Sequence, residues 1–127
     1  MQEENIFQIL EHANQSERKV QVETDDVFTY IALELNDVKW ARSDLYLRTL
    51  LYDIEQQPRA NWVDFSNIFM YLTGQPVHFF DAKKVEGDII VRNARNGETF
   101  VDLFEKEHTL IAQDIVIADT TKILALA

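Results

Sequence analysis

The stretch WVDFSNIFMYLTGQPVHFF, residues 62–80, changes from a helical pattern to a strand-like one within a few residues. Its first part carries apolar side chains at the three- and four-residue spacing that places them on one helix face. These side chains are Phe65, Ile68, Phe69 and Leu72. Gly74 ends the predicted helix over 62–73, and Pro76 prevents its resumption. Short apolar runs follow from residue 77 onward, which predicts a mostly antiparallel sheet in that part of the chain.

A second helix is predicted just upstream, with Ser43 as its N-cap and its end at about Gln56. Its apolar positions have the same helical spacing. They are Leu47, Leu50, Leu51 and Ile54. Before this helix, residues 19–23 and 27–35 alternate apolar and polar side chains, which predicts two strands. The longer of the two is expected to have one well-buried face.

The strongest turn signal lies further along, at Asn96-Gly97 between the strand-like runs 88–94 and 98–104. Asn and Gly both accept positive φ, so the pair predicts a β-hairpin. Three more strand-like runs follow. They are 108–113, 114–119, which reads as buried, and 122–127. The last run reaches the final residue, which fits either a truncated domain or a C-terminal strand that closes a sheet. The fold class is therefore mixed α/β (α+β), with two adjacent helices and a mostly antiparallel β-sheet.

Composition describes a small globular chain without metal or membrane signals. Of the 127 residues, 46% are apolar, and there is no cysteine to form disulfides or thiolate metal sites. The three histidines are far apart, so no metal site is expected. No apolar run approaches the roughly 20 residues that span a bilayer, and the N-terminus lacks a signal pattern, which predicts a cytoplasmic chain. The net charge, 12 − 22 = −10, argues against a free-standing nucleic-acid binder.

Residues 64–100 resemble the β chain of bacterial phenylalanyl-tRNA synthetase. The most specific match is Gly-Gln-Pro-x-His-x-Phe-Asp, which begins at Gly74 and ends at Asp81. Before it stands the family's Asp-x-Thr/Ser-Asn, and after it Gly-x-Ile-x-Val-Arg-x-Ala and Gly-Glu. Those positions are Asp64, Ser66, Asn67, Gly87, Ile89, Val91, Arg92, Ala94, Gly97 and Glu98. The resemblance divides the chain into an N-terminal helix and linker, 1–18, with a short helix over 4–13, and a truncated tRNA-editing domain, 19–127.

The resemblance implies one part of a larger ligase. In that family the β chain pairs with an α chain in a heterotetramer, and the α chain activates phenylalanine with ATP and magnesium. The β-chain domain hydrolyses tRNA(Phe) mischarged with tyrosine, using a positioned water. The fragment itself is expected to need no cofactor. Its family's key glutamate and Gly-Met-Gly-Gly turn lie beyond residue 127, so the isolated chain is expected to deacylate Tyr-tRNA poorly.

Carried over position by position, the resemblance assigns His78 and Asn67 to catalysis and Ser66, Gln75 and Gln57 to the substrate pocket. His78 is predicted to open toward a concave surface with Asn67 beside it, because the turn after the helix can fold the chain back. Gln57 stands where many members have Arg. Phe79 stands where Ala is common, and a ring there narrows the pocket if it points inward.

Each of these residues also has a structural interpretation. His78 after a turn can be a hydrogen-bonded structural residue. Ser66 and Asn67 favour local bonds to the backbone, and Asp64 fits a helix cap better than a catalytic acid. His12 and His108 are predicted to be surface residues. Two further functions therefore stay open: a non-catalytic scaffold or RNA-binding module of the same subunit, and a free-standing relative of the domain.

Overall fold

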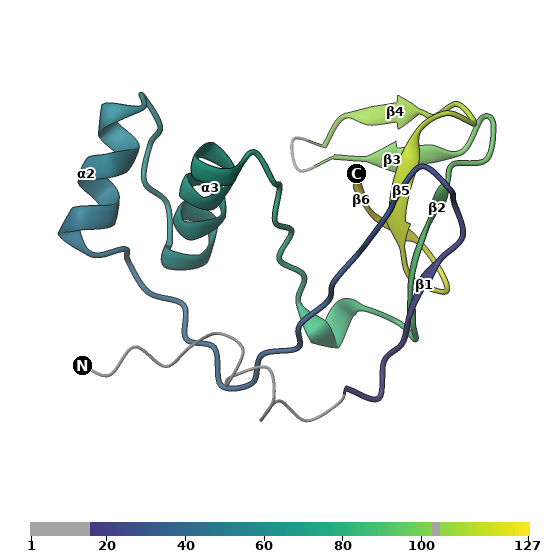
Figure 1. Cartoon of the computed structure of the whole chain (residues 1–127), viewed down its shortest axis with the longest axis horizontal. Coiled ribbons are helices and arrows are strands. Elements are labelled where there is room, and N and C mark those ends of the chain that lie inside the picture. Colours follow the sequence, from purple (N-terminus) through teal and green to yellow (C-terminus); the bar gives the residue numbers. More distant parts are fainter. Residues whose placement is uncertain (1–15, 103–104) are drawn as a thin grey trace.

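The computed structural model describes residues 16–102 and 105–127, and the predicted helix over 4–13 lies outside them. Two helices, α2 (Leu45–Asp53) and α3 (Asn61–Thr73), pack against each other. They stand to one side of the strands (Figure 1). The segment after α3 leads through a short 3-10 helix, η1 (Ala82–Lys84), into the sheet. The predicted α+β class with two adjacent helices is confirmed.

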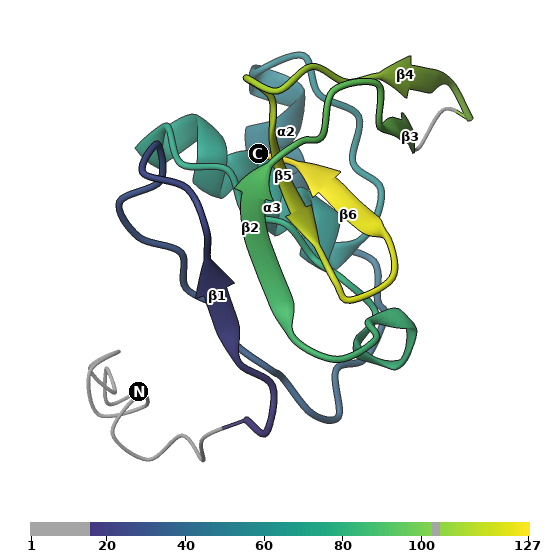
Figure 2. The same cartoon turned by 90° about the vertical axis from the view of Figure 1, so that its right-hand side faces the viewer.

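The strands form two sheets (Figure 2). The larger sheet has the order β1-β2-β5-β6, in which β1 runs parallel to β2 and the other neighbours are antiparallel. The smaller sheet pairs β3 with β4, also antiparallel. The strands are β1 (Val20–Val22), β2 (Ile89–Asn93), β3 (Thr99–Val101), β4 (Glu107–Thr109), β5 (Ile115–Ala118) and β6 (Ile123–Leu126). The prediction of a mostly antiparallel sheet after residue 77 is therefore confirmed.

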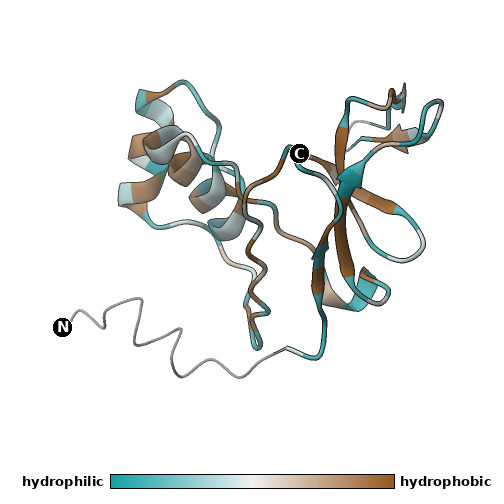
Figure 3. Ribbon diagram, turned by 45° about the vertical axis from the view of Figure 1, so that its right-hand side comes forward, coloured by the Kyte–Doolittle hydropathy of each residue, from teal (hydrophilic) through white to brown (hydrophobic). Residues whose placement is uncertain are grey.

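The sheet has its own hydrophobic core, centred on β2 and β5, whose ribbons are largely apolar (Figure 3). Val91 and Val116 are fully buried, and Ile117 is nearly so. Phe100 and Ile123 pack against the cluster of Ala94, Leu110 and Val116. This explains why the run 114–119, predicted to be a buried strand, forms β5: only a strand buried on both faces needs a continuous apolar sequence.

Local hydrogen bonds set the ends of the two helices. The carboxylate of Asp44 accepts a bond from the Leu47 amide at 2.8 Å and caps α2. The prediction of Ser43 as the N-cap was wrong by one residue, because the Ser43 hydroxyl is bonded elsewhere, and the helix ends at Asp53 rather than near Gln56. Gly74 ends α3 as predicted, in the left-handed conformation with φ 73°.

The prediction of a long strand over 27–35 was wrong. This segment is irregular, and most of its large apolar side chains are exposed, with Phe28 fully open to solvent and Ile31 76% exposed. A strand needs a neighbour for its backbone, and no strand in the described part of the chain pairs with this one. Residues 77–80 are also irregular rather than a strand.

The predicted hairpin at Asn96-Gly97 was wrong in its pairing. Residues 95–98 do form a turn, closed by the Glu98 amide and the Arg95 carbonyl at 2.9 Å. Beyond this turn, however, β2 and β3 belong to different sheets. Both edges of β2 are already occupied, by β1 and β5, so β3 pairs with β4 instead.

Candidate functional site

The candidate site is built from α3 and from the segment that returns after it. Phe79 packs on Trp62 in the first turn of α3, with ring centroids 5.6 Å apart. The chain after Gly74 therefore runs back toward the start of the helix, as the sequence predicted. His78 and Phe80 stack on each other at 6.1 Å, so the segment presents alternate side chains to two sides. Whether His78 and Asn67 lie side by side stays a prediction.

The His78 side chain is exposed at the surface, yet partial burial lowers its pKa below the ordinary value. Burial disfavours the charged imidazolium, so the ring is neutral at neutral pH. A neutral imidazole has one free nitrogen lone pair and can accept a proton from water. His78 can therefore act as a base or orient a water molecule.

The other predicted residues lie on three short segments. Ser66 and Asn67 are half-buried on the second turn of α3, where the Ser66 hydroxyl donates to the Val63 carbonyl at 2.7 Å. Gln75 is exposed just after Gly74, and Gln57 is exposed in the loop between α2 and α3. The helix and the two segments beside it thus carry all five residues, and the Gln75 backbone amide donates to the Thr73 hydroxyl at 3.1 Å.

Asp64 organises this region more directly than sequence reasoning indicated. Its side chain is fully buried, and one carboxylate oxygen accepts a bond from the Ser43 hydroxyl. The other accepts from the Arg59 amide at 2.7 Å. The Asp64 carboxylate, in the first turn of α3, thereby holds two segments. One is the segment just before α2, and the other is the loop between the helices, which includes Gln57. A sequence pattern for a helix cap includes only residues close together in the chain. It could not predict the bond to Ser43, because Ser43 is 21 residues away from Asp64.

A depression in the described structure lies away from these residues. It has a volume of about 280 Å³ and lies over the sheet, and none of the five predicted residues lines it. Its walls combine three basic and three acidic side chains. They are Arg92, Arg95, Lys122, Glu23, Glu98 and Asp119. Arg92 is held by Glu98 through two bonds of 2.9 and 2.7 Å, so this charge is already matched within the chain.

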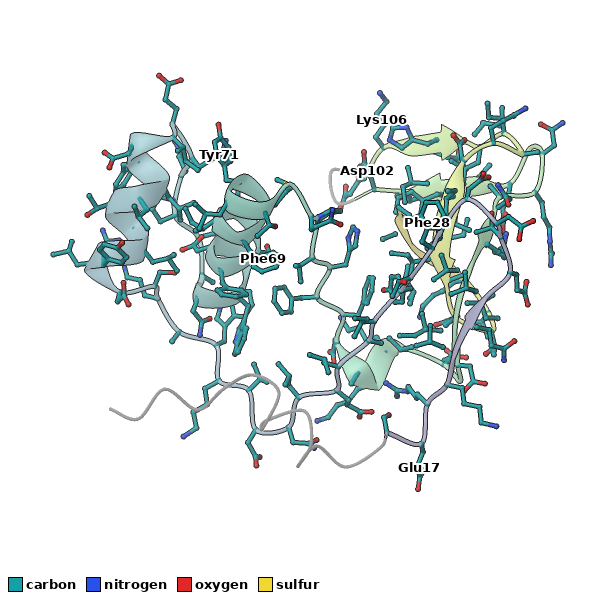
Figure 4. All side chains as sticks on the ribbon, viewed as in Figure 1. Glu17, Phe28, Phe69, Tyr71, Asp102 and Lys106 are labelled. Atoms are coloured by element: carbon teal, nitrogen blue, oxygen red, sulfur yellow. The ribbon has the colours of Figure 1, made fainter. Side chains whose placement is uncertain are left out.

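The third histidine gives no second site. His108 lies on β4 and contacts the Asp102 carboxylate at 2.8 Å. The β3–β4 hairpin stands at the sheet end of the molecule, away from Phe69 and Tyr71 on α3 (Figure 4). Among the described residues there is no group of three or more potential metal ligands. Within that same part of the chain, no helix is long and apolar enough to cross a membrane.

Comparison with known proteins gives the family. The family model described as the B3/4 domain matches residues 26–127. This chain belongs to the B3/4 domain family. The match includes α2, α3 and every strand except β1.

Curated relatives of this B3/4 domain are named phenylalanine–tRNA ligase beta subunit. The protein from Aquifex aeolicus is 38% identical over 108 residues, which cover 85% of this chain and 14% of the relative. Those from Latilactobacillus sakei and Streptococcus pneumoniae serotype 4 are 42% and 41% identical, over 78% and 85% of this chain. They are covered to 13% and 14%, so the chain spans about one seventh of their length.

The B3/4 domain is expected to lose stability in acid. The Arg92 hydrogen bond and the Arg95 amide lower the pKa of Glu98 to about 2. Because the folded pKa lies below the ordinary value of 4.5, the stabilisation is complete above pH 4.5 and is lost as pH falls toward 2. Urea midpoints measured from pH 6 to pH 2.5 should fall, and Glu98→Gln should flatten that fall. An equally steep fall in Glu98→Gln would contradict the assignment.

Proposed function

We propose that this B3/4 domain is part of a phenylalanine–tRNA ligase β subunit and contributes to the hydrolysis of tyrosine from mischarged tRNA(Phe). The observation that carries the proposal is the match to ligase β subunits over most of the chain. The fold supports it, because the segment that carries His78 returns toward the start of α3, the helix that carries Ser66 and Asn67. The whole enzyme would then include an α chain that uses ATP and magnesium to charge phenylalanine.

The proposed chemistry is hydrolysis of an aminoacyl ester by water. A neutral His78 would take a proton from the attacking water as the water oxygen bonds to the ester carbonyl carbon, and would return that proton to the ribose oxygen as the carbon–oxygen ester bond breaks. The Asn67 amide offers both a donor and an acceptor to the terminal ribose hydroxyls. Ser66, Gln75 and Gln57 would contact the remainder of the aminoacyl-adenosine. The described residues contain no cysteine nucleophile, and the mechanism needs no covalent intermediate.

The second candidate is a non-catalytic scaffold of the same subunit. It is favoured by the exposed apolar side chains between β1 and α2, since such surfaces mark contacts with other proteins or domains. The largest exposures there are those of Phe28, Ile31, Leu33 and Trp40. A scaffold would need these side chains but would have no use for His78.

A ligase assembled from the full-length β subunit with an α chain separates these two functions. We expect His78→Ala to slow deacylation of Tyr-tRNA(Phe) by about 10²-fold, with phenylalanine charging unchanged. His108→Ala is the matched control and should leave both rates unaltered. Normal clearance of Tyr-tRNA(Phe) by the His78→Ala enzyme would reject the editing role and favour the scaffold. The 127-residue chain alone is expected to turn over far more slowly than the ligase.

A further inference from the structure

The segment that leads into α2 is held against the start of α3 by Asn61, the first residue of that helix. The side-chain oxygen of Asn61 accepts from the Ala41 amide at 3.3 Å, and its side-chain nitrogen donates to the Lys39 carbonyl at 3.2 Å. The Asn61 backbone amide donates to the Ala41 carbonyl at 2.9 Å. Three hydrogen bonds therefore fix residues 39–41, although these residues belong to no helix or strand.

Trp40 lies between the two anchored residues, yet it is 73% exposed. Within the described residues, no other ring packs on its indole. Tryptophan is a large part of the energy of most surfaces that bury it, so an exposed ring leaves that stabilisation unused. A fixed backbone that presents an open aromatic ring is therefore suited to a partner with a flat face.

Three cationic side chains accompany this ring. Lys39 and Arg42 flank it in the sequence, and Arg59 is brought near by the buried Asp64 carboxylate, which binds both the Ser43 hydroxyl and the Arg59 amide. All three cations are exposed, and none forms an ion pair within the described part of the chain. Exposed cations without internal partners attract anionic ligands.

Nearby carboxylates cancel this charge only in part. Asp44 is engaged as the cap of α2, and Asp64 is buried with both oxygens bonded. Asp37 and Glu55 are the exposed carboxylates closest in sequence to the three cations. A small positive excess remains in a chain whose net charge is −10. Binding of an anion here is therefore expected to be weak in the isolated chain and to fall with added salt.

We propose that Lys39, Trp40, Arg42 and Arg59 form a platform for single-stranded RNA, with a base stacked on Trp40 and the cations on neighbouring phosphates. The inference rests on the proposed function for its partner, the unpaired 3′ end of an aminoacylated tRNA. Single strands are bound in this way, by aromatic rings that stack on bases and by cations that follow the backbone. The ring alone would fit any apolar partner, and the cations select one that carries phosphates.

The platform adjoins the candidate site. Asn61, which holds it, is followed by Trp62, and Trp62 packs on Phe79, the neighbour of His78. An RNA end that crosses the platform would therefore continue toward the segment that carries His78. The platform would bind the RNA without touching the ester, so binding and hydrolysis can be disturbed independently.

The fluorescence of single-tryptophan variants tests the stacking. The chain has two tryptophans. Trp62 packs on Phe79, and its indole nitrogen is buried without a hydrogen-bond partner among the described residues. Trp62→Phe leaves only Trp40, and Trp40→Phe is the matched control. A short single-stranded RNA should quench the emission of Trp62→Phe and leave that of Trp40→Phe unchanged. Inorganic polyphosphate, which has no bases, should quench neither variant.

The salt dependence of the affinity counts the phosphate contacts. For single strands the logarithm of the association constant falls by about 0.7 per contact for each unit of log salt, so three contacts give a slope of about −2. Arg42→Ala and Arg59→Ala keep the backbone bonds described above and should each remove about 0.7 from this slope. Lys106→Ala removes an exposed lysine at the sheet end of the molecule and should leave the slope unchanged (Figure 4).

The possible results separate the platform from the proposed function. No RNA binding at low salt, binding that leaves Trp40 unquenched, or equal quenching by polyphosphate would each overturn the platform. Deacylation of Tyr-tRNA(Phe) by the full ligase would still support the editing role in that case. Quenching and slope as expected, with no deacylation by the ligase, would keep the platform and reject the editing role. Circular dichroism checks the folding of each variant, and if Trp62→Phe does not fold, the unchanged chain is compared with Trp40→Phe instead.

Discussion

Replacing Asp119 by alanine is expected to lower the free energy of unfolding by about 4 kcal/mol, because it removes a buried carboxylate that accepts several hydrogen bonds. Asp119 follows β5, and its side chain is fully buried. One oxygen accepts from the Thr121 amide, the Thr121 hydroxyl and the Lys122 amide at 2.7, 2.9 and 2.8 Å. The other accepts from the Glu86 amide at 3.0 Å. Alanine would leave these donors without an acceptor.

The pKa of Asp119 shows which effect dominates. Burial alone raises the pKa, but the bonds from Glu86, Thr121 and Lys122 outweigh it and lower the pKa to about 2. The charged carboxylate is thus the form that the fold stabilises. Asp119→Asn is the informative control. Its oxygen can keep the Thr121 and Lys122 bonds, while its NH₂ group would face the Glu86 amide.

Urea denaturation at pH 7 should therefore rank the three proteins, with Asp119→Asn between Asp119→Ala and the unchanged chain. A loss below about 1 kcal/mol in Asp119→Ala would show that water replaces the carboxylate at little cost. The turn between β5 and β6 would then not depend on this residue.

Local signals in the sequence were sufficient for α3 and for β5. The spacing of apolar residues and the glycine after the helix act within a few residues of the chain, so both ends of α3 were predicted to within one residue. β5 was predicted from an apolar run that is buried on both faces. In both cases the signal and the structure that it predicts occupy the same residues.

Signals that depend on distant partners were not sufficient. The run 27–35 has the alternation of a strand, but a strand also requires a neighbour, which no sequence pattern names. At Asn96-Gly97 the backbone explains the error. Gly97 has a positive φ of 82°, whereas Asn96 does not. The two-residue hairpin turns that follow the strand twist, types I′ and II′, both need positive φ at their first residue, so the chain turns here without pairing β2 to β3.

The sequence likewise predicted one part of the candidate site and missed another. The octet that ends α3 marked the segment carrying Gln75 and His78, and the structure places that segment beside the helix start through Phe79. The unpartnered Trp62 nitrogen had no signal, since tryptophan at a helix start reads as an ordinary core residue. Burial and the absence of an acceptor are properties of the packed structure, and both depend on residues far away in the chain.

Asp64→Ala is expected to lower the free energy of unfolding by about 3 kcal/mol and to loosen the loop that carries Gln57. The carboxylate is completely buried and accepts one bond from the Ser43 hydroxyl and one from the Arg59 amide. Alanine would leave both donors without their acceptor and a space where the carboxylate was. In native-state hydrogen exchange the Arg59 amide should then exchange much faster than the amides inside α3.

Substitutions of Asp64 and of Ser43, the two ends of the buried bond, test what causes the loss of stability in Asp64→Ala. The cause is either the hydrogen bonds of the carboxylate or the volume that it fills. Asp64→Asn keeps an oxygen for the Arg59 amide, and its NH₂ group can donate to the Ser43 hydroxyl, which accepts as readily as it donates. This variant should lose only about 1 kcal/mol. Ser43→Ala removes one bond and leaves the carboxylate buried with an unused oxygen. The losses in Ser43→Ala and Asp64→Ala should therefore sum to more than the loss in the double variant, because one interaction is counted twice. Strictly additive losses would mean that Ser43 and Asp64 stabilise the helix pair independently, and the loop bearing Gln57 would then be held by the Arg59 bond alone.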